Sequence, residues 1–419
     1  MAGGDRDGPP VARDGSRANR AERVERRGVD LSGTRESHRL ELVGHNDLAG
    51  RGDGMQIMRQ GDALYVGHMG PSGMATSVLD VGDPRKPELV RQIPAAAGSH
   101  SHKVQTADDL LLVNEEQFQG AQEFSAGMLV YELSDALDPK PIGRFESGGL
   151  GVHRIVYAGG RYAYMSAIPD GFDDRIWVIV DLDDPTSPTE VGRWWWPGMW
   201  RGGGESPSWP GTKRYAAHHA LIDDQVAYLG YGDAGMVVLD ISDIEHPRKL
   251  SDLSWSPGGE THTCLPLPGR NLVVATDEAV ANRCAEETKL VRVIDVSDVH
   301  SPRVVGQCPQ PDGDYCDRGL RFGPHNLHEN RPGTYRSETL MFVTYFNAGL
   351  RVYDITNPAA PIEAGFWVPE TPDGQEAPQI NDVLVDASHN IFVSDRIGGG
   401  LYVLAPDESL SKAMEEARS

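Results

Sequence analysis

The most regular pattern in the chain is a short apolar run that ends in an acidic residue and is followed by a turn. The clearest copy, residues 178–185, reads Val-Ile-Val-Asp-Leu-Asp-Asp-Pro. A second apolar run precedes each copy, and Pro and a further strand-like segment follow it. A unit of about four short strands per 50 or so residues, separated by Gly, Pro, Asn and Asp, is typical of a β-propeller blade. The other copies are residues 77–84, 130–134, 237–243, 292–298, 351–358 and a degenerate one at 401–406.

Seven copies predict an all-β fold, a seven-bladed β-propeller over residues 38–407. Residues 40–43 (Leu-Glu-Leu-Val) resemble the strand that follows Pro in the other repeats, and the seventh copy lacks such a strand. We therefore predict that residues 38–45 complete the last blade and close the ring. Residues 1–30, rich in Arg, Gly and acidic residues, predict a disordered tail, and residues 408–419 predict a short helix or tail.

Composition narrows the class of protein and its partners. Only 39% of residues are hydrophobic, with 48 Gly and 29 Pro, which disfavours a helical bundle. A formal net charge of -23 argues against nucleic acid as a partner. Because we find neither an apolar run of about 18 residues nor a signal-like segment, we expect a soluble, cytoplasmic protein with no membrane partner. The four cysteines lack Cys-x-x-Cys spacing, so we expect free thiols rather than a zinc ribbon.

The repeat core also resembles a known family. The Val-Ile-Val-Asp motif at residues 178–181 and its relatives around Asp240, Asp295 and Asp354 are similar to those of the LVIVD-repeat proteins. This resemblance implies a β-propeller over roughly residues 38–407. The family implies a fold and little chemistry, so the site has to be sought in the residues themselves.

Histidine recurs at the start of the strand that opens the repeats, which in a propeller lines the central channel. Equivalent positions on different blades converge on one axis, so imidazoles far apart in sequence are expected to point into a common space. Met55 and Asn381 occupy this position in the first and last repeats. The histidines of the second to sixth repeats are His102, His153, His219, His262 and His325.

Two interpretations of these histidines remain open. Neutral imidazole is the commonest metal ligand, and three to five imidazoles without thiolate suit a transition metal, with Fe or Cu favoured and Mn or Zn as alternatives. In the other interpretation each histidine forms a hydrogen bond with an aspartate of its own or the next blade, and the repeated acidic residue is a candidate partner. The first repeat keeps Asp80 without a histidine, which favours the metal site.

Three further residues are candidates for general acid or base catalysis because they lie close to the histidines in sequence. Glu260 precedes His262 by two residues, Asp382 follows Asn381, and His328 follows His325 by three residues. A carboxylate at such a place can orient an imidazole or accept a proton. The alternative for each is a solvated loop residue.

The segment between the third and fourth repeats carries five of the eight tryptophans among Gly and Pro, at residues 194–209. Such a loop can fold over the channel mouth and give an aromatic wall to a substrate pocket. Alternatively it packs locally, with Trp194 and Trp196 in an outer strand. The predicted pocket residues are Trp200, Glu205, Trp209, Met55 and Asn381.

We therefore expect a metal-dependent propeller enzyme that acts on a small organic, aromatic or apolar substrate. An oxidoreductase is favoured; the alternatives are a metal-dependent lyase or hydrolase and a non-catalytic scaffold with structural histidines. Selenium-binding (methanethiol oxidase) and carotenoid-oxygenase propellers also carry axial histidines, which is an analogy only. Walker, dinucleotide-binding and Gly-x-Ser-x-Gly motifs are absent from the sequence, which argues against nucleotide-dependent and serine-hydrolase chemistry. The sequence leaves the oligomeric state open.

Overall fold

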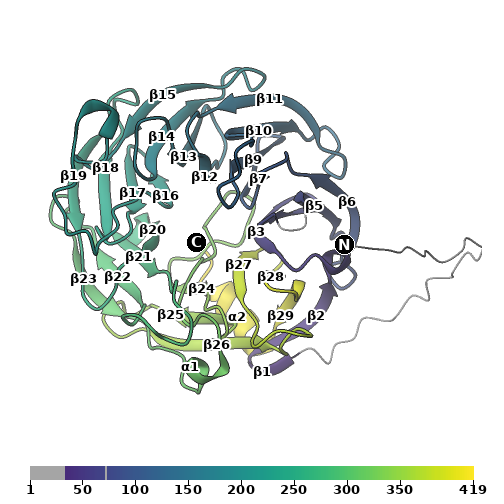
Figure 1. The fold of residues 1–419 in the computed structure, drawn as a ribbon. Helices are drawn as coiled ribbons and strands as arrows, with labels where there is room; N and C mark the ends of the chain where they lie inside the picture. Colours follow the sequence, from purple (N-terminus) through teal and green to yellow (C-terminus); the bar gives the residue numbers. More distant parts are fainter. Residues whose placement is uncertain (1–33, 71–72) are drawn as a thin grey trace, which may run out of the picture.

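A computed structural model describes residues 34–70 and 73–419; the predicted disordered tail, residues 1–30, lies outside them. The described chain forms antiparallel sheets that follow one another around a common centre (Figure 1). The first sheet contains β3 (Gly54–Gln60), β4 (Ala63–His68), β5 (Met74–Asp80) and β6 (Glu88–Pro94). The second has nine strands: β7 (Ser99–His100), β8 (Val104–Ala107), β9 (Leu110–Gln117), β10 (Gly127–Glu132), β11 (Lys140–Glu146), β12 (Gly151–Val156), β13 (Tyr162–Ile168), β14 (Ile176–Asp181) and β15 (Thr189–Trp194).

Four sheets of four strands complete the ring. One contains β16 (Ala220–Asp223), β17 (Val226–Gly230), β18 (Met236–Asp240) and β19 (Arg248–Leu253). The next contains β20 (Thr261–Leu267), β21 (Leu272–Asp277), β22 (Val291–Asp295) and β23 (Arg303–Gln307). A further sheet contains β24 (Leu340–Thr344), β25 (Leu350–Asp354), β26 (Ile362–Pro369) and β1 (Thr34–His38). The last contains β27 (Ile380–Val385), β28 (Ile391–Asp395), β29 (Gly400–Pro406) and β2 (Leu40–Asn46). The structure is therefore all-β and propeller-like.

The two ends of the described strand region meet in one sheet. β2 pairs antiparallel with β29, with Leu42 opposite Leu404, so the N-terminal strand completes the last sheet as predicted. β1, which the sequence did not predict, pairs with β26 of the neighbouring sheet. Arg39, at a φ of 62°, lies between the two strands where the chain passes from one sheet to the next.

Burial decreases from the centre of the ring to its rim. Most residues of β4 and β28 are buried, whereas the outer strand β6 is largely exposed. The core lies between neighbouring sheets: one apolar cluster joins Val78 of the first sheet to Val113 of the second and Val403 of the last. Since each sheet is covered on both faces by its neighbours, its outermost strand is the most exposed, as in β6.

The repeated acidic residue shapes a turn at the end of the third strand. Asp240 Oδ1 accepts a hydrogen bond from Ser242 N, and Asp295 and Asp354 accept the equivalent bond two residues on. This is the local turn bond that aspartate favours. The repeated acidic residues at these positions are therefore engaged at the rim and are not the partners of the central histidines.

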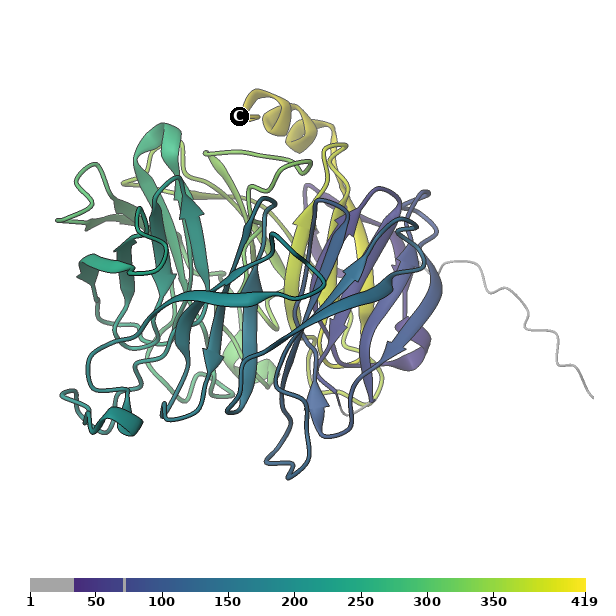
Figure 2. The same cartoon turned by 90° about the horizontal axis from the view of Figure 1, so that it is seen from above.

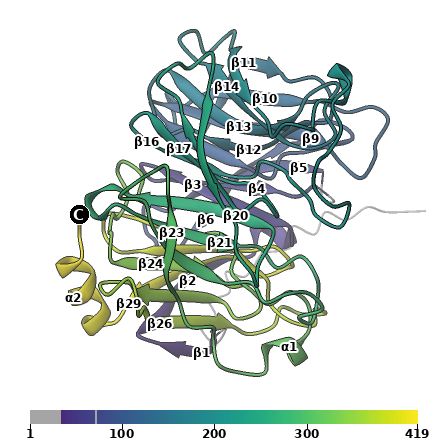
Figure 3. The same ribbon diagram turned by 90° about the vertical axis from the view of Figure 1, so that its left-hand side faces the viewer.

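The remaining elements lie outside the sheets. Helix α1 (Tyr315–Arg318) and helix α2 (Glu408–Glu416) lie on opposite faces of the ring (Figures 2 and 3). α2 buries Leu410 and Met414, and short 3₁₀ turns occupy η1 (Leu48–Gly50), η2 (Arg201–Gly203) and η3 (Pro268–Arg270). None of the helices in the described residues is long and apolar enough to span a membrane.

The prediction of free thiols is wrong for two of the four cysteines. Cys284 and Cys316 form a disulfide, and Cys264 and Cys308 are free and buried. The two bonded residues are 32 positions apart in the sequence, and their Cα atoms lie 5.5 Å apart because the fold brings their loops together. Sequence spacing alone gave no sign of this pairing.

Candidate metal centre

Six imidazoles form a continuous row at the centre of the ring. Neighbouring ring centroids in this row lie 3.9–4.9 Å apart. The residues come from different strands of several sheets. His102 precedes β8 and His153 lies in β12, both in the nine-stranded sheet, whereas His262 lies in β20 of another sheet. In order along the row, the six are His100, His102, His153, His218, His262 and His325.

β-bulges place histidines at the centre. His153 is skipped between the paired residues Val152 and Arg154, and His262 is skipped in the same way between Thr261 and Thr263. Asn381 of the last sheet occupies the equivalent bulge. A bulge leaves its extra residue unpaired and redirects its side chain. Two consecutive residues of an inner strand can therefore both face the channel.

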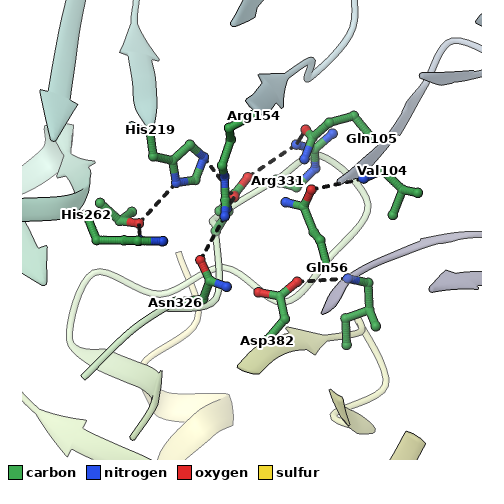
Figure 4. Close-up of polar contacts among 12 residues, drawn as sticks. Gln56, Val104, Gln105, Arg154, His219, His262, Asn326, Arg331 and Asp382 are labelled. Atoms are coloured by element: carbon green, nitrogen blue, oxygen red, sulfur yellow. Dashed lines mark hydrogen bonds and ion pairs between the residues drawn. The ribbon is translucent and has the colours of Figure 1, made fainter. Parts of the chain in front are cut away.

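The residues that follow the row form a second polar layer. Arg154 Nη1 donates to Asn326 Oδ1 at 2.9 Å, and Ile57 N donates to Asp382 Oδ2 at 2.8 Å. Figure 4 shows Arg154 beside Asn326 and His219, with Gln56 and Asp382 across the channel. The second layer is made up of Gln56, Lys103, Arg154, His219, Thr263, Asn326 and Asp382.

His219 belongs to this second layer, and His218 takes the place predicted for it. His218 N donates to Gly230 O and Gly230 N donates to His219 O, the pattern that His325 and Asn326 make with Thr344. The side chain of His219 lies 3.1 Å from Thr263 Oγ1 and 3.2 Å from Glu329 Oε1. Because Ala220 and Leu221 are both apolar, the sequence pattern could not distinguish the two registers.

Several ring nitrogens have no partner although they are buried. Nε2 of His102 and Nε2 of His262 make no hydrogen bond with the described residues. Nε2 of His153 and Nε2 of His218 face each other at 3.1 Å. Buried nitrogen atoms normally have a partner, so unpaired ones call for an explanation.

The opposite nitrogens are held by the protein. His325 Nδ1 lies 2.8 Å from the carbonyl oxygen of Asn381, to which it donates, and His262 Nδ1 lies 2.7 Å from Thr263 Oγ1. A proton on Nδ1 leaves Nε2 with a free lone pair, the arrangement seen in metal-ligating histidines. The fixed ring orientations leave the Nε2 atoms available as ligands.

Burial keeps these imidazoles neutral. It lowers the pKa of His102, His218, His262 and His325 well below the ordinary value, and nearby cationic groups lower it further. Burial, followed by the charge of Arg175, lowers the pKa of His153 to about 3. Neutral imidazole is the form that binds a metal ion.

Two glutamates complete the ligand set. Glu116 Oε2 lies 2.6 Å from His100 Nε2 and 2.9 Å from His153 Nδ1. Burial raises the pKa of Glu116, but its attraction to the protonated form of His153 and the hydrogen bonds from both histidines hold it well below its usual range. Glu278 Oε1 accepts a hydrogen bond from Arg321 at 3.0 Å and lies 3.7 Å from His325 Nε2.

Among the described residues, two groups could hold a metal ion: His100 with His102 and Glu116, and His218 with His262 and Glu278. In each group the ligand atoms all lie within 4.8 Å of one another. The sequence analysis predicted neither Glu116 nor Glu278 as a metal ligand. A usable signal exists, because both glutamates lie at the end of the second strand of a repeat, β9 or β21.

The predicted acid–base residues lie outside these two groups. Both ring nitrogens of His328 are bonded to backbone, Nε2 to Tyr335 O at 2.7 Å and Nδ1 to Val385 N at 3.2 Å. Glu260 lies 3.8 Å from Arg214, and burial raises its pKa. Asp382 is buried in the second layer, and burial raises its pKa too. A catalytic role for these residues stays a prediction, and the contacts of His328 favour a structural role.

The Trp-rich segment packs on itself and on its neighbours. Glu205 Oε2 accepts hydrogen bonds from Gly198 N at 2.7 Å and Trp200 N at 3.1 Å, and Trp209 stacks on Tyr215 with ring centroids 4.6 Å apart. These contacts favour the local-packing alternative over an aromatic wall around the centre. Trp200, Glu205 and Trp209 as pocket residues stay a prediction.

Met55 and Asn381, the other two predicted pocket residues, are buried beside the row. Asn381 O accepts from His325, and its Nδ2 has no partner among the described residues. Met55 O accepts a hydrogen bond from Ser394 Oγ across the neighbouring sheet. A role for Met55 and Asn381 in a substrate pocket stays a prediction.

Three segments of the chain match the LVIVD repeat. They are residues 154–194, 222–250 and 337–367. No curated protein matches the sequence. Similar solved structures include the periplasmic gluconolactonase PpgL of Pseudomonas aeruginosa, at 12% identity and a TM-score of 0.50 over 87% of this chain and 94% of that one. A protein from Lactobacillus plantarum has 13% identity and a TM-score of 0.51 over 83% and 93%. At these identities the likeness extends to the fold alone.

Proposed function

We propose that the protein is a metal-dependent enzyme whose ion is bound by the row of histidines at the centre of a seven-bladed propeller. In this proposal the nine-stranded sheet counts as two blades, β8–β11 and β12–β15, joined through β7 and the contact between Gly151 and Glu116. Each blade then contributes one inner segment to the channel. The repeats at residues 77–84 to 401–406 supply the third strand of each blade.

One observation carries this proposal: buried nitrogens of His102 and His262 lack partners beside the facing nitrogens of His153 and His218. An unsatisfied buried polar atom costs about 1–3 kcal/mol. A bound cation removes this cost for several imidazoles at once. The alternative of a structural His–Asp pair is met elsewhere, at His68, whose Nδ1 lies 2.7 Å from Asp53 Oδ1.

The donor set selects the class of ion. Imidazole and carboxylate without thiolate suit Fe, Cu, Mn or Zn, and Fe or Cu is favoured by the number of imidazoles. Such an ion would exchange electrons with a small organic substrate, so an oxidoreductase is favoured. With Zn or Mn the ion would act as a Lewis acid, which supports a lyase or hydrolase.

The protein's own residues contribute positioning and charge to this centre. Asn381 and Thr263 fix the orientation of His325 and His262, and Glu116 holds His153. The buried guanidinium of Arg175 acts on His153 and His218, and it is a candidate to orient a negatively charged part of the substrate.

The cytoplasmic location expected from the sequence stays a prediction. The disulfide between Cys284 and Cys316 favours an oxidising compartment, because disulfides are rare in the cytosol of most organisms.

Elemental analysis of the purified protein tests the proposal. We expect a stoichiometric transition metal in the wild type and its loss in a His102→Ala, His262→Ala double variant that keeps its circular dichroism spectrum. His246→Ala is the matched control, because this imidazole is exposed on the surface. Folded wild-type protein that takes up no Fe, Cu, Mn or Zn would refute the enzyme and support a scaffold with structural histidines.

A further inference from the structure

We infer that the centre holds two metal ions side by side, an inference that rests on the metal centre proposed above. Eight side chains, six imidazoles and two carboxylates, line the row. One ion of the classes considered takes four to six donors. The ligand set is therefore larger than one ion needs, and the structure divides it into two groups.

The first half contains His100, His102 and Glu116, with His153 next to them. Glu116 Oε2 lies within 2.9 Å of nitrogens from both His100 and His153. Nδ1 of His100 and Nε2 of His102 are buried and have no hydrogen-bond partner among the described residues. This half thus offers one carboxylate and two free imidazole nitrogens, with His153 at its edge.

The second half repeats this composition with residues from other sheets. His218 and His262 have ring centroids 3.9 Å apart, and Glu278 lies close to both. Nδ1 of His218 and Nε2 of His262 are buried without a partner. His325 borders this half, with its ring centroid 4.3 Å from that of His262 and its Nε2 3.7 Å from Glu278 Oε1.

The two halves meet at His153 and His218. His153 faces both, because its Nδ1 points to Glu116 and its Nε2 lies 3.1 Å from His218 Nε2. Two donors on one tetrahedral ion with bonds of about 2.1 Å lie about 3.4 Å apart. The 3.1 Å separation of these nitrogens is close to that of two donors on one ion, so no protein layer separates the two halves at this point.

The carboxylates are shared between the halves. Each half contains one glutamate, Glu116 or Glu278, beside its imidazoles. Paired ions held by these residues would stabilise both the attacking and the leaving oxygen of a substrate. The inference therefore favours a substrate that carries an oxygen donor, such as a carboxylate, hydroxyl or peroxide.

Titration of metal-stripped wild-type protein with Co²⁺ tests the inference without any substitution. We expect the visible absorption of bound Co²⁺ to rise until two equivalents are added. A break at one equivalent would overturn the two-ion inference and leave the proposed function intact. Absence of any bound Co²⁺, Zn²⁺, Cu²⁺, Fe²⁺ or Mn²⁺ would overturn both.

Single variants then test the division into halves. His102→Ala removes a ligand from the first half only and His262→Ala one from the second only, so each is expected to bind one equivalent. The exposed His246→Ala control is expected to keep two. If either single variant, folded by circular dichroism, loses all bound Co²⁺ or keeps two equivalents, the division into two halves is wrong.

Discussion

Replacement of Gly230 by alanine is expected to disturb the centre through the backbone of a neighbouring strand. Gly230 ends β17 and packs against the bulge of β20 that carries His262. A Cβ at this position would lie 2.4 Å from His262 O, 2.6 Å from His262 C and 2.8 Å from Thr261 O. Ordinary van der Waals contact is about 3.5 Å, so the bulge must move by about 1 Å.

The size of this movement decides which measurement is sensitive. Overpacking costs about 1–3 kcal/mol. At about 2.1 cal/mol/K per residue, the unfolding entropy of a chain of this size turns that cost into a fall in Tm of only about 1–3 °C. Metal-ligand bonds tolerate about 0.2 Å, so a shift of about 1 Å at His262 should weaken the ion of the second half about 10- to 100-fold.

Co²⁺ titration of Gly230→Ala, with Tm from circular dichroism, is the assay. Gly211→Ala is the matched control, because a Cβ at Gly211 meets no atom within 4 Å. We expect the control to behave like the wild type in both measurements. A Gly230→Ala protein that binds Co²⁺ with wild-type affinity would show that the bulge is not fixed by this close contact.

Three further outcomes are expected. His218→Ala should lower the metal content, whereas His219→Ala should leave it unchanged. The His219→Ala variant should still destabilise the fold, because buried Glu329 loses one contact. Equal metal loss in both variants would refute the assignment of His218 to the row. Burial raises the pKa of the Cys264 and Cys308 thiols, so both stay protonated at pH 8. A thiol reagent should therefore label no cysteine in the native protein, two after denaturation, and four after denaturation and reduction. Labelling of four cysteines without a reductant would exclude the disulfide. Hydrogen bonds from Ser297 and Arg303 lower the pKa of Asp295 to about 2, so the stabilisation that Asp295 gives is present above its ordinary pKa near 4 and is lost as the pH falls towards 2. The difference in urea midpoint between the wild type and Asp295→Asn should therefore shrink over that range. A constant difference would contradict this role of Asp295.

The predicted acid–base residues illustrate the limit of sequence proximity. His328 lies three residues from His325, but backbone groups at Tyr335 and Val385 occupy both of its ring nitrogens. Glu116 and His100 were not predicted as ligands, although they lie beside His153 and His102 in space. Closeness in sequence to a histidine of the row does not predict contact with that histidine, because its side chain is surrounded by residues from other strands and loops.

The sequence by itself determined the repeat and what the repeat requires. Apolar strands with an acidic turn residue every 50 or so positions can bury both faces only by stacking against copies of themselves, which predicts a ring of sheets. The same periodicity placed His102, His153, His262 and His325 near one axis, and the strand around Leu42 was correctly paired with the last sheet.

Only the tertiary structure decided the details of the site. Bulges set which of two consecutive residues enters the histidine layer, and so replaced His219 by His218, a shift of one residue that the apolar pattern does not record. Contacts between loops remote in sequence brought Cys284 to Cys316, and contacts such as that between Trp195 and Trp200 pack the Trp-rich segment on itself. Such contacts depend on the distance between segments remote in sequence, which the local pattern of apolar and polar residues does not encode.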